Sequence, residues 1–257
     1  MTETKLSAVV AEQVLTNLAA FWADPLPDIM GRQPARIAGS PHDQEIPEGV
    51  RNPYWEIVRQ LPVCGISLEY DRRYQPDGHF FSPRDPMRQV ASRHSLCPAF
   101  AWSIISPGDV AWIAGRLDGR GVVEPGAGGG YWAWQLAQAG VDVAAYDPAA
   151  ETGSKYAVGE PWFTVLTDGH EATAHHPDRS LLLCWPSYSE PWAAQALACY
   201  EGDQLFYAGE GPGGCCADDA FFDLAEAEWT EVGDAPAHVT YSGIHCYLTE
   251  YRRKAAR

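Results

Sequence analysis

A glycine-rich turn, placed between an expected strand and an expected helix, restricts the fold of this chain more than any other feature. The turn spans residues 124–130 (EPGAGGG), the apolar residues 121–123 precede it, and a helical pattern runs from Tyr131 to Gly140. Glycines at such a junction let a ligand approach the backbone and the N-terminus of the helix. The sequence therefore predicts a nucleotide-type binding site.

The spacing of the glycines separates the kinds of nucleotide loop. A phosphate-binding P-loop ends in Gly-Lys-Ser/Thr, whereas this turn ends in Gly130-Tyr131. A dinucleotide-binding loop has the pattern G-x-G-x-x-G, which, counted from Gly126 and Gly128, requires a glycine where this chain has Tyr131. A count that starts at another glycine keeps a dinucleotide loop as an alternative. Glu124, two residues before the first glycine, would repel a pyrophosphate and attract a cation. The pattern Glu-x-Gly-x-Gly-x-Gly therefore favours a ligand without a pyrophosphate group.

From residue 121 onward, apolar runs of strand length alternate with helical patterns. This order is typical of an α/β fold: a mostly parallel sheet with helices on both faces, completed here by an antiparallel terminal strand or hairpin. Asp218 or Asp219 is the expected N-cap of the last helix. Strands are expected at 121–126, 141–147, 161–169, 180–186 and 203–211, helices at 131–140, 190–200 and 218–229, and the hairpin at 238–253.

The N-terminal part of the chain has a different pattern. We expect residues 1–98 to form a helical and irregular cap or arm, and residues 99–257 to form the α/β domain. The arm either closes over the binding site or contacts another chain. Helices are expected at 5–22 and 52–61, a Pro-, Gly- and Asp-rich loop at 23–55, and a mainly helical stretch at 86–117 that breaks at Ser106-Pro107.

Composition limits the classes of partner and the cellular location that we expect for this chain. A net charge of −16 disfavours nucleic acid as a partner, because phosphate binding is largely electrostatic. The seven cysteines form no C-x-x-C pair, so the sequence predicts neither a disulfide framework nor a metal site. No apolar run approaches the roughly 18 residues that span a bilayer, and the N-terminus does not resemble a signal peptide. We therefore expect a cytoplasmic protein without a membrane partner.

The turn at 124–130, followed by an aspartate at the tip of the next strand, resembles the first motifs of the class I S-adenosylmethionine (SAM)-dependent methyltransferases. The resemblance covers roughly residues 100–251 and implies the Rossmann-like fold of that family, with SAM as the cofactor. In the family, the turn passes under the amino-acid portion and the ribose of SAM, and the aspartate accepts hydrogen bonds from the ribose hydroxyls. Asp147 matches that aspartate.

The resemblance also implies contacts from a helix before the first strand and from an acidic residue near the adenine. Trp102, Ser103 and Trp185 are equally consistent with core packing, and Asp168 with a plain Asp-Gly turn. The cofactor-binding residues that the resemblance implies are Trp102, Ser103, Glu124, Gly126, Ala127, Gly128, Gly130, Asp147, Asp168 and Trp185.

Candidate catalytic residues follow strands whose carboxyl ends face the expected ligand. The stretch CWPSY is similar to the Asn/Asp-Pro-Pro-Tyr/Trp motif of amino-group methyltransferases, but Trp185 replaces the polar residue and Ser187 the second proline. The rings of Trp185 and Tyr188 can stabilise a sulfonium or a developing ammonium by cation–π attraction. Glu210 is a candidate ligand for a substrate cation or a general base, and His245 a candidate proton acceptor. A solvated loop glutamate and a histidine without a catalytic role are the alternatives.

These features predict a SAM-dependent methyltransferase that acts on a small-molecule metabolite by N- or O-methylation, as in specialised metabolism. Tryptophans at 102, 132, 134 and 185 suggest an apolar pocket, and the acidic balance favours a neutral or cationic substrate. Two alternatives stay open. The altered CWPSY stretch is consistent with a non-methylating reaction such as a cyclisation or elimination. The long N-terminal arm is consistent with a partner subunit or a homo-oligomer.

Overall fold

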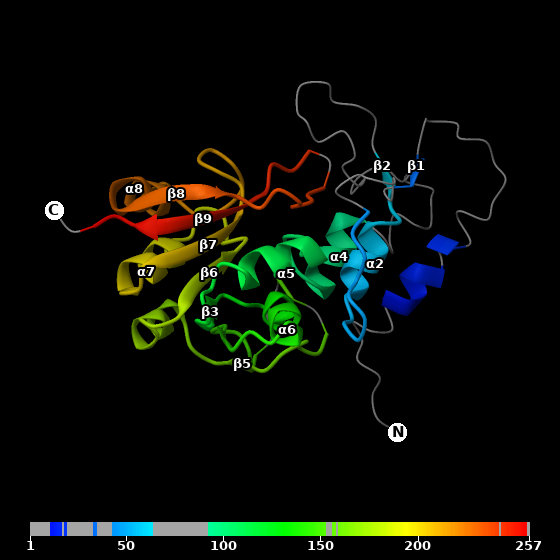
Figure 1. Ribbon diagram of the computed structural model, residues 1–257, viewed down its shortest axis with the longest axis horizontal. Coiled ribbons are helices and arrows are strands. Elements are labelled where there is room, and N and C mark those ends of the chain that lie inside the picture. Colours follow the sequence, from blue (N-terminus) through cyan, green and yellow to red (C-terminus); the bar gives the residue numbers. More distant parts are fainter. Residues whose placement is uncertain are drawn as a thin grey trace.

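The computed structural model describes residues 11–16, 18–19, 33–34, 43–63, 92–152, 156–157, 159–241 and 243–255. Their main sheet is built from β3 (Val122–Pro125), β4 (Val143–Tyr146), β5 (Val165–Leu166), β6 (Ser180–Cys184), β7 (Gln204–Gly209), β8 (Trp229–Asp234) and β9 (Tyr247–Arg253). The strand order is β5-β4-β3-β6-β7-β9-β8 (Figure 1). The first five strands are parallel, and β9 runs antiparallel to both β7 and β8. A separate two-stranded pair joins β1 (Gln33–Pro34) to β2 (Pro62–Val63).

The helices begin and end where local signals in the sequence place them. α5 (Pro107–Ala114) begins with a capping box, in which Ser106 and Asp109 each accept a hydrogen bond from the backbone N–H of the other. Asp218, one of the two residues expected, caps α8 (Asp219–Glu228). The other helices are α2 (Pro53–Val58), α4 (Arg93–Ala99), α6 (Tyr131–Gln138), the 3-10 helix η1 (His170–His175) and α7 (Trp192–Cys199). None of the helices in the described ranges is long and apolar enough to cross a membrane.

The central strands place their side chains in two hydrophobic clusters, one on each face of the sheet. In β3, Val122 belongs to the cluster that includes residues of α5 and α6, whereas Val123 belongs to the cluster that includes residues of α7 and α8. Phe206 and Leu205 of β7 divide in the same way. Successive side chains of a strand point to opposite faces, so this division buries the sheet on both sides. The predicted α/β fold is confirmed.

Aromatic side chains join the described N-terminal residues to the face that carries α6. Tyr54 of α2 stacks on Phe100 with ring centroids 4.9 Å apart, and Tyr131 of α6 contacts both rings edge-on. The Tyr131 hydroxyl donates a hydrogen bond to Asn52 Oδ1 (2.8 Å) and accepts one from the Tyr54 backbone (3.0 Å). α2 is thereby fixed to the helix that follows the glycine turn. The expected boundary at residue 98 falls inside α4, and the division into cap and domain stays a prediction.

Several elements differ from the sequence prediction: the strand expected at 161–169 is reduced to β5, and η1, β1 and β2 were not expected. β9 pairs with β8, which directly follows α8, and residues 238–241 and 243–246 of the expected hairpin are irregular. β8 is an edge strand with mostly exposed side chains, so its sequence lacks the apolar run that marks the other strands. Residues 100–106 are irregular where a helix was expected, because Ser106 caps α5 and Pro107 occupies its first turn. The expected helix at 5–22 and loop at 23–55 lie largely outside the described residues.

Candidate functional site

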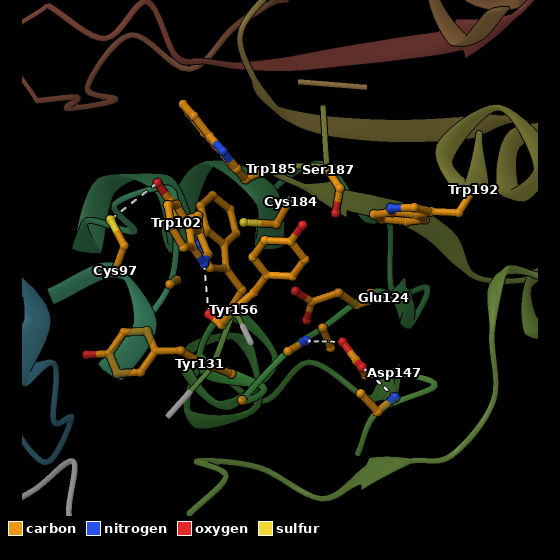
Figure 2. A pocket seen from close by; sticks show the side chains of 18 of the residues that line it. Cys97, Trp102, Glu124, Tyr131, Asp147, Tyr156, Cys184, Trp185, Ser187 and Trp192 are labelled. Atoms are coloured by element: carbon orange, nitrogen blue, oxygen red, sulfur yellow. Dashed lines mark hydrogen bonds between the residues drawn. The ribbon is translucent and has the colours of Figure 1, made fainter. Parts of the chain in front are cut away.

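A cavity of about 720 Å³ opens at the carboxyl ends of β3, β4 and β6. β4 and β5 lie on one side of β3 in the sheet, whereas β6, the next strand of the chain, lies on the other side of β3. In open α/β sheets, ligands bind at the point where the strand order reverses in this way. Figure 2 shows Trp102, Glu124, Asp147, Tyr156 and Trp185 gathered around this space. The sequence-predicted residues that line the cavity are Trp102, Glu124, Gly126, Ala127, Gly128, Asp147, Trp185 and Tyr188.

The glycine turn forms the floor of this cavity. Gly126 and Gly128 have φ values of +70° and +56°, in the left-handed region that side chains disfavour. A Cβ atom at Gly126 would lie 2.6 Å from Cη2 of Trp192, so the ring of Trp192 requires glycine there. Among the atoms of the described residues, the nearest to a Cβ built at Gly128 is the Ala157 Cβ, at 3.8 Å. The space beside Gly128 is therefore open to a ligand.

Asp147 lies just beyond the end of β4, half-buried at the edge of the cavity. Its Oδ2 accepts a hydrogen bond from the Gly128 backbone (2.9 Å), and its Oδ1 accepts one from the Ala149 backbone (2.8 Å). The carboxylate therefore ties the glycine turn to the loop after β4. Each carboxylate oxygen has a second lone pair, so Asp147 retains the capacity to accept hydrogen bonds from a ligand.

Glu124 is the one charged residue of β3, and only 1% of its surface is exposed. The pKa of its carboxyl is raised to about 8, mainly by burial and to a smaller extent by the negative charge of Asp147, while a hydrogen bond from the Ala133 backbone lowers it. Its Oε2 has no hydrogen-bond partner among the residues that the structure describes. A buried carboxyl oxygen without a partner is unfavourable unless a ligand satisfies it.

Trp185 follows β6 and has a φ of +48°, an uncommon conformation for a residue other than glycine. Its backbone N–H donates to the Ala208 carbonyl (2.7 Å). Ala217, in the segment between β7 and α8, braces the same loop: its N–H donates to the Pro186 carbonyl (3.0 Å), and its carbonyl accepts from the Ser189 N–H (2.8 Å). Strained residues persist where surrounding bonds over-determine them, often at functional sites. The loop is thus a rigid support that holds the Trp185 ring at the cavity.

Glu210 and His245 are not among the residues that line the cavity. Glu210 is buried, and its two carboxylate oxygens accept hydrogen bonds from the backbones of Cys215 (2.7 Å) and His245 (2.8 Å). This arrangement connects the loop after β7 to the segment before β9. The side chain of His245 is exposed. Their roles as general base and proton acceptor stay predictions.

Three residues predicted to bind the cofactor also lie outside the lining of the cavity. Ser103 is buried, with its Oγ 3.2 Å from the Cys246 sulfur. Gly130 is the N-cap of α6. Asp168 is exposed beyond β5, although the adjacent Gly169 lines the cavity. Contacts of these three residues with a cofactor stay predictions.

Several lining residues were not singled out from the sequence. Arg93, in the first turn of α4, is one of them, and it lies in the segment before the first strand where only Trp102 and Ser103 were noted. Tryptophan was expected at the site, but of the four positions named, Trp134 is not among the lining residues. The unanticipated lining residues with the largest side chains are Arg93, Phe100, Tyr131, Tyr156, His170, Glu190 and Trp192.

Comparisons with known proteins give one sequence relative and several distant structures. No protein-family model matches the chain. The ribosomal RNA large subunit methyltransferase M of Marinobacter nauticus is 32% identical over 148 residues, which cover 56% of this chain. The match spans 38% of the length of that relative.

Two solved structures were compared in the same way. Magnesium protoporphyrin IX methyltransferase from Synechocystis PCC 6803, with bound SAM, gives a TM-score of 0.35 at 15% identity, over 56% of this chain and 76% of that one. The 1,6-didemethyltoxoflavin-N1-methyltransferase of Burkholderia thailandensis, with bound 1,6-didemethyltoxoflavin and S-adenosylhomocysteine (SAH), gives a TM-score of 0.37 at 16% identity. It matches over 58% of this chain and 77% of that one.

The strand order decides the fold independently of these similarities. Five parallel strands are followed by β8 and β9, and β9 inserts antiparallel between β7 and β8. This order is typical of the class I methyltransferases. The chain has the class I methyltransferase fold. Within the class I fold, the glycine turn follows the central strand and Asp147 follows its neighbour, in the positions that the sequence predicted for them.

Proposed function

We propose that this protein is a SAM-dependent methyltransferase that acts on a small organic molecule. The observation that carries the proposal is the Asp147 carboxylate at the tip of β4. It is hydrogen-bonded to the backbone of Gly128 at 2.9 Å and borders a cavity of about 720 Å³. A carboxylate in this place can accept hydrogen bonds from a ribose diol that would otherwise be buried without acceptors.

Three features of the cavity fit SAM. Asp147 has free lone pairs for the ribose hydroxyls, and Glu124 has an unpartnered Oε2 for the positively charged amino group. The space beside Gly128 leaves room for the nucleoside. Each feature supplies what one part of the cofactor requires, and a buried carboxyl oxygen such as Oε2 of Glu124 is costly unless it has a partner.

When bound, SAM supplies an electrophilic methyl group on a sulfonium. The residues of the chain would orient the reactants and exclude water, which are the main contributions that an in-line displacement needs. Asp147 and Glu124 would hold the cofactor, and the rings of Trp102 and Trp185 would cover the space beside it. Trp185 would keep its position because the backbone bond to Ala208 fixes it. Glu210 and His245 remain the proposed proton acceptors for a nucleophile that must lose a proton.

A small molecule is the proposed acceptor because the cavity has the size of a small-molecule site and the chain is strongly acidic. Ligand pockets typically have volumes of roughly 300–1,000 Å³. The net charge of −16 opposes binding of a polyanion. A second candidate function, methyl transfer to RNA, is favoured by the identity to an enzyme named as a ribosomal RNA methyltransferase. A non-methylating reaction remains a third candidate, because Trp185 and Ser187 depart from the amino-methyltransferase motif.

Transfer of a labelled methyl group separates these candidates. The protein is incubated with SAM labelled in its methyl group and with two acceptor pools, a filtered small-molecule extract and total ribosomal RNA. We expect label in a small organic product and none in RNA, and the Asp147→Ala variant should transfer none to either pool. Label in RNA would favour the second function instead. SAM binding without label in either pool would favour a non-methylating reaction.

A further inference from the structure

Arg93 is a buried cation at the cavity, and the residues that the structure describes supply no counter-ion for it. Its side chain lines the cavity and is only 7% exposed. Its Nε has no hydrogen-bond partner, and none of the ion pairs within the described ranges includes it. A buried charge without a partner is strongly unfavourable, and arginine cannot escape this by losing its proton. None of the described residues neutralises this charge, so an anion of a bound ligand would find a favourable partner here.

Two tryptophan rings hold the guanidinium in place. Its central carbon lies 4.9 Å from the centroid of the Trp185 ring and 5.4 Å from that of the Trp102 ring. Stacking on aromatic rings engages the faces of the planar guanidinium and leaves its N–H donors at the edge available. The Trp185 backbone is fixed in its strained conformation, so the arrangement is preorganised. A guanidinium edge of this kind matches a carboxylate, which it can bind through two parallel hydrogen bonds.

Cys97 and Tyr241, the two ionisable groups whose pKa values Arg93 affects most clearly, are neutral at neutral pH. Burial raises the pKa of the Cys97 thiol to about 11, although Arg93 opposes the shift, so Cys97 is neutral beside it. Burial also raises the pKa of the Tyr241 hydroxyl well above its usual value, again against the effect of Arg93. Glu124, with a pKa of about 8, is mainly protonated at pH 7. The carboxylate of Asp147 lies beside the glycine turn after β4, where it accepts two backbone hydrogen bonds, and no ion pair within the described residues joins it to Arg93.

We propose that Arg93 binds a carboxylate of the methyl acceptor, and that the acceptor is a planar aromatic acid packed against Trp102 and Trp185. This inference rests on the proposed function and names its substrate class. It also replaces the neutral or cationic substrate that the overall charge of the chain favoured.

The position of Arg93 favours the acceptor over the cofactor as the source of the carboxylate. Asp147, the proposed ribose ligand, follows β4, whereas Trp185, against which Arg93 stacks, follows β6. β3 lies between these strands, so the two positions are about 10 Å apart at a spacing of about 4.8 Å per strand. Arg93, which stacks on Trp185, therefore lies nearer the β6 end of the cavity than the proposed ribose ligand does. The alternative source, the amino-acid carboxylate of SAM itself, is an outcome of the test.

Matched acids and amides test the proposal in the protein saturated with SAH. The probes are indole-3-carboxylate and 2-naphthoate, each paired with its primary amide, with affinities measured by calorimetry. We expect the wild type to bind each acid at least about tenfold more tightly than its amide, because a hydrogen bond to a charged group typically contributes this much to affinity. Arg93→Gln should abolish that preference, and Arg93→Lys, which keeps the charge but not the planar fork, should retain part of it.

A second arginine provides the matched control. Arg116 lies over the Trp112 ring at 4.1 Å and pairs with Glu250, but it is not among the lining residues of the cavity. Arg116→Gln should therefore keep the preference for acids. Because Arg93 is buried and forms no ion pair with the described residues, Arg93→Gln should unfold at the same temperature as the wild type or a higher one. If Arg93→Gln does not fold, reduced acid preference in Arg93→Lys supports the proposal and unchanged preference overturns it.

Measured SAH affinity separates the remaining outcomes. All Arg93 variants should bind SAH as tightly as the wild type does. Weakened SAH binding with an intact acid preference would assign Arg93 to the cofactor and overturn the proposal. A wild type that binds no acid better than its amide would overturn it as well. A wild type that does not bind SAH would refute the proposed function, which is a different result from either of these.

Discussion

Asp147→Ala is expected to weaken SAH binding by at least about a hundredfold, because the variant loses two charge-assisted hydrogen bonds to the ribose. The substitution also removes the acceptor of the Gly128 and Ala149 backbone N–H groups, so the glycine turn loses part of its support. Both effects act on the same site and should add. Titration calorimetry with SAH at neutral pH measures the change.

The matched control for Asp147→Ala is Asp142→Asn, at the other end of β4. Asp142 precedes the strand, is exposed, and forms an ion pair with Arg179 far from the cavity lining. Asp142→Asn should bind SAH like the wild type. Thermal unfolding shows whether either variant is globally destabilised. A folded Asp147→Ala protein that keeps wild-type affinity would contradict the proposed role of Asp147.

Glu124 should make the stability of the ligand-free protein fall as the pH rises from about 4.5 to about 8. The pKa of its carboxyl is about 8 in the folded protein and 4.5 in the unfolded chain, so the folded state holds more protons in this window. The part of the free energy of unfolding that is linked to this raised pKa is fully present below pH 4.5 and is lost as the pH rises through 8. At 1.36 kcal/mol per pKa unit, the full change is up to about 5 kcal/mol.

The comparison with Glu124→Gln isolates this contribution, because glutamine does not ionise and all other titratable groups are shared. Urea unfolding of both proteins between pH 5 and pH 9 gives the difference in free energy of unfolding at each pH. We expect the wild type to lose stability relative to the variant across this range. A difference that stays constant with pH would show that Glu124 is not a buried carboxyl with a raised pKa.

The parts of the site that depend on local chemistry were predictable from the sequence. Glycine adopts the positive φ of positions 126 and 128 without the strain that a side chain would add, and the strand before the turn fixes where the turn lies. Asp147 was found because one strand–helix–strand unit places it beside that turn. The edge strand β8 was missed because its exposed side chains follow no apolar pattern.

Long-range contacts were beyond the reach of sequence patterns. Arg93 meets Trp185, from a distant part of the chain, only because α4 packs near the end of β6. No spacing rule relates two such positions. The same limit applies to Glu210, whose place after a strand suggested a role at the site. Its oxygens accept hydrogen bonds from the Cys215 and His245 backbones, contacts that only the folded structure brings together, and its role at the site stays a prediction.

Calorimetric titration of the purified wild-type protein with SAM and with SAH tests the central claim most directly. The site formed by the glycine turn, Glu124 and Asp147 should bind one molecule of either compound with roughly micromolar affinity. The two ligands share the ribose and the amino-acid portion, so both should bind at the same site. No heat of binding for either ligand, from protein shown to be folded by its cooperative thermal unfolding, would contradict the assignment of this cavity to SAM.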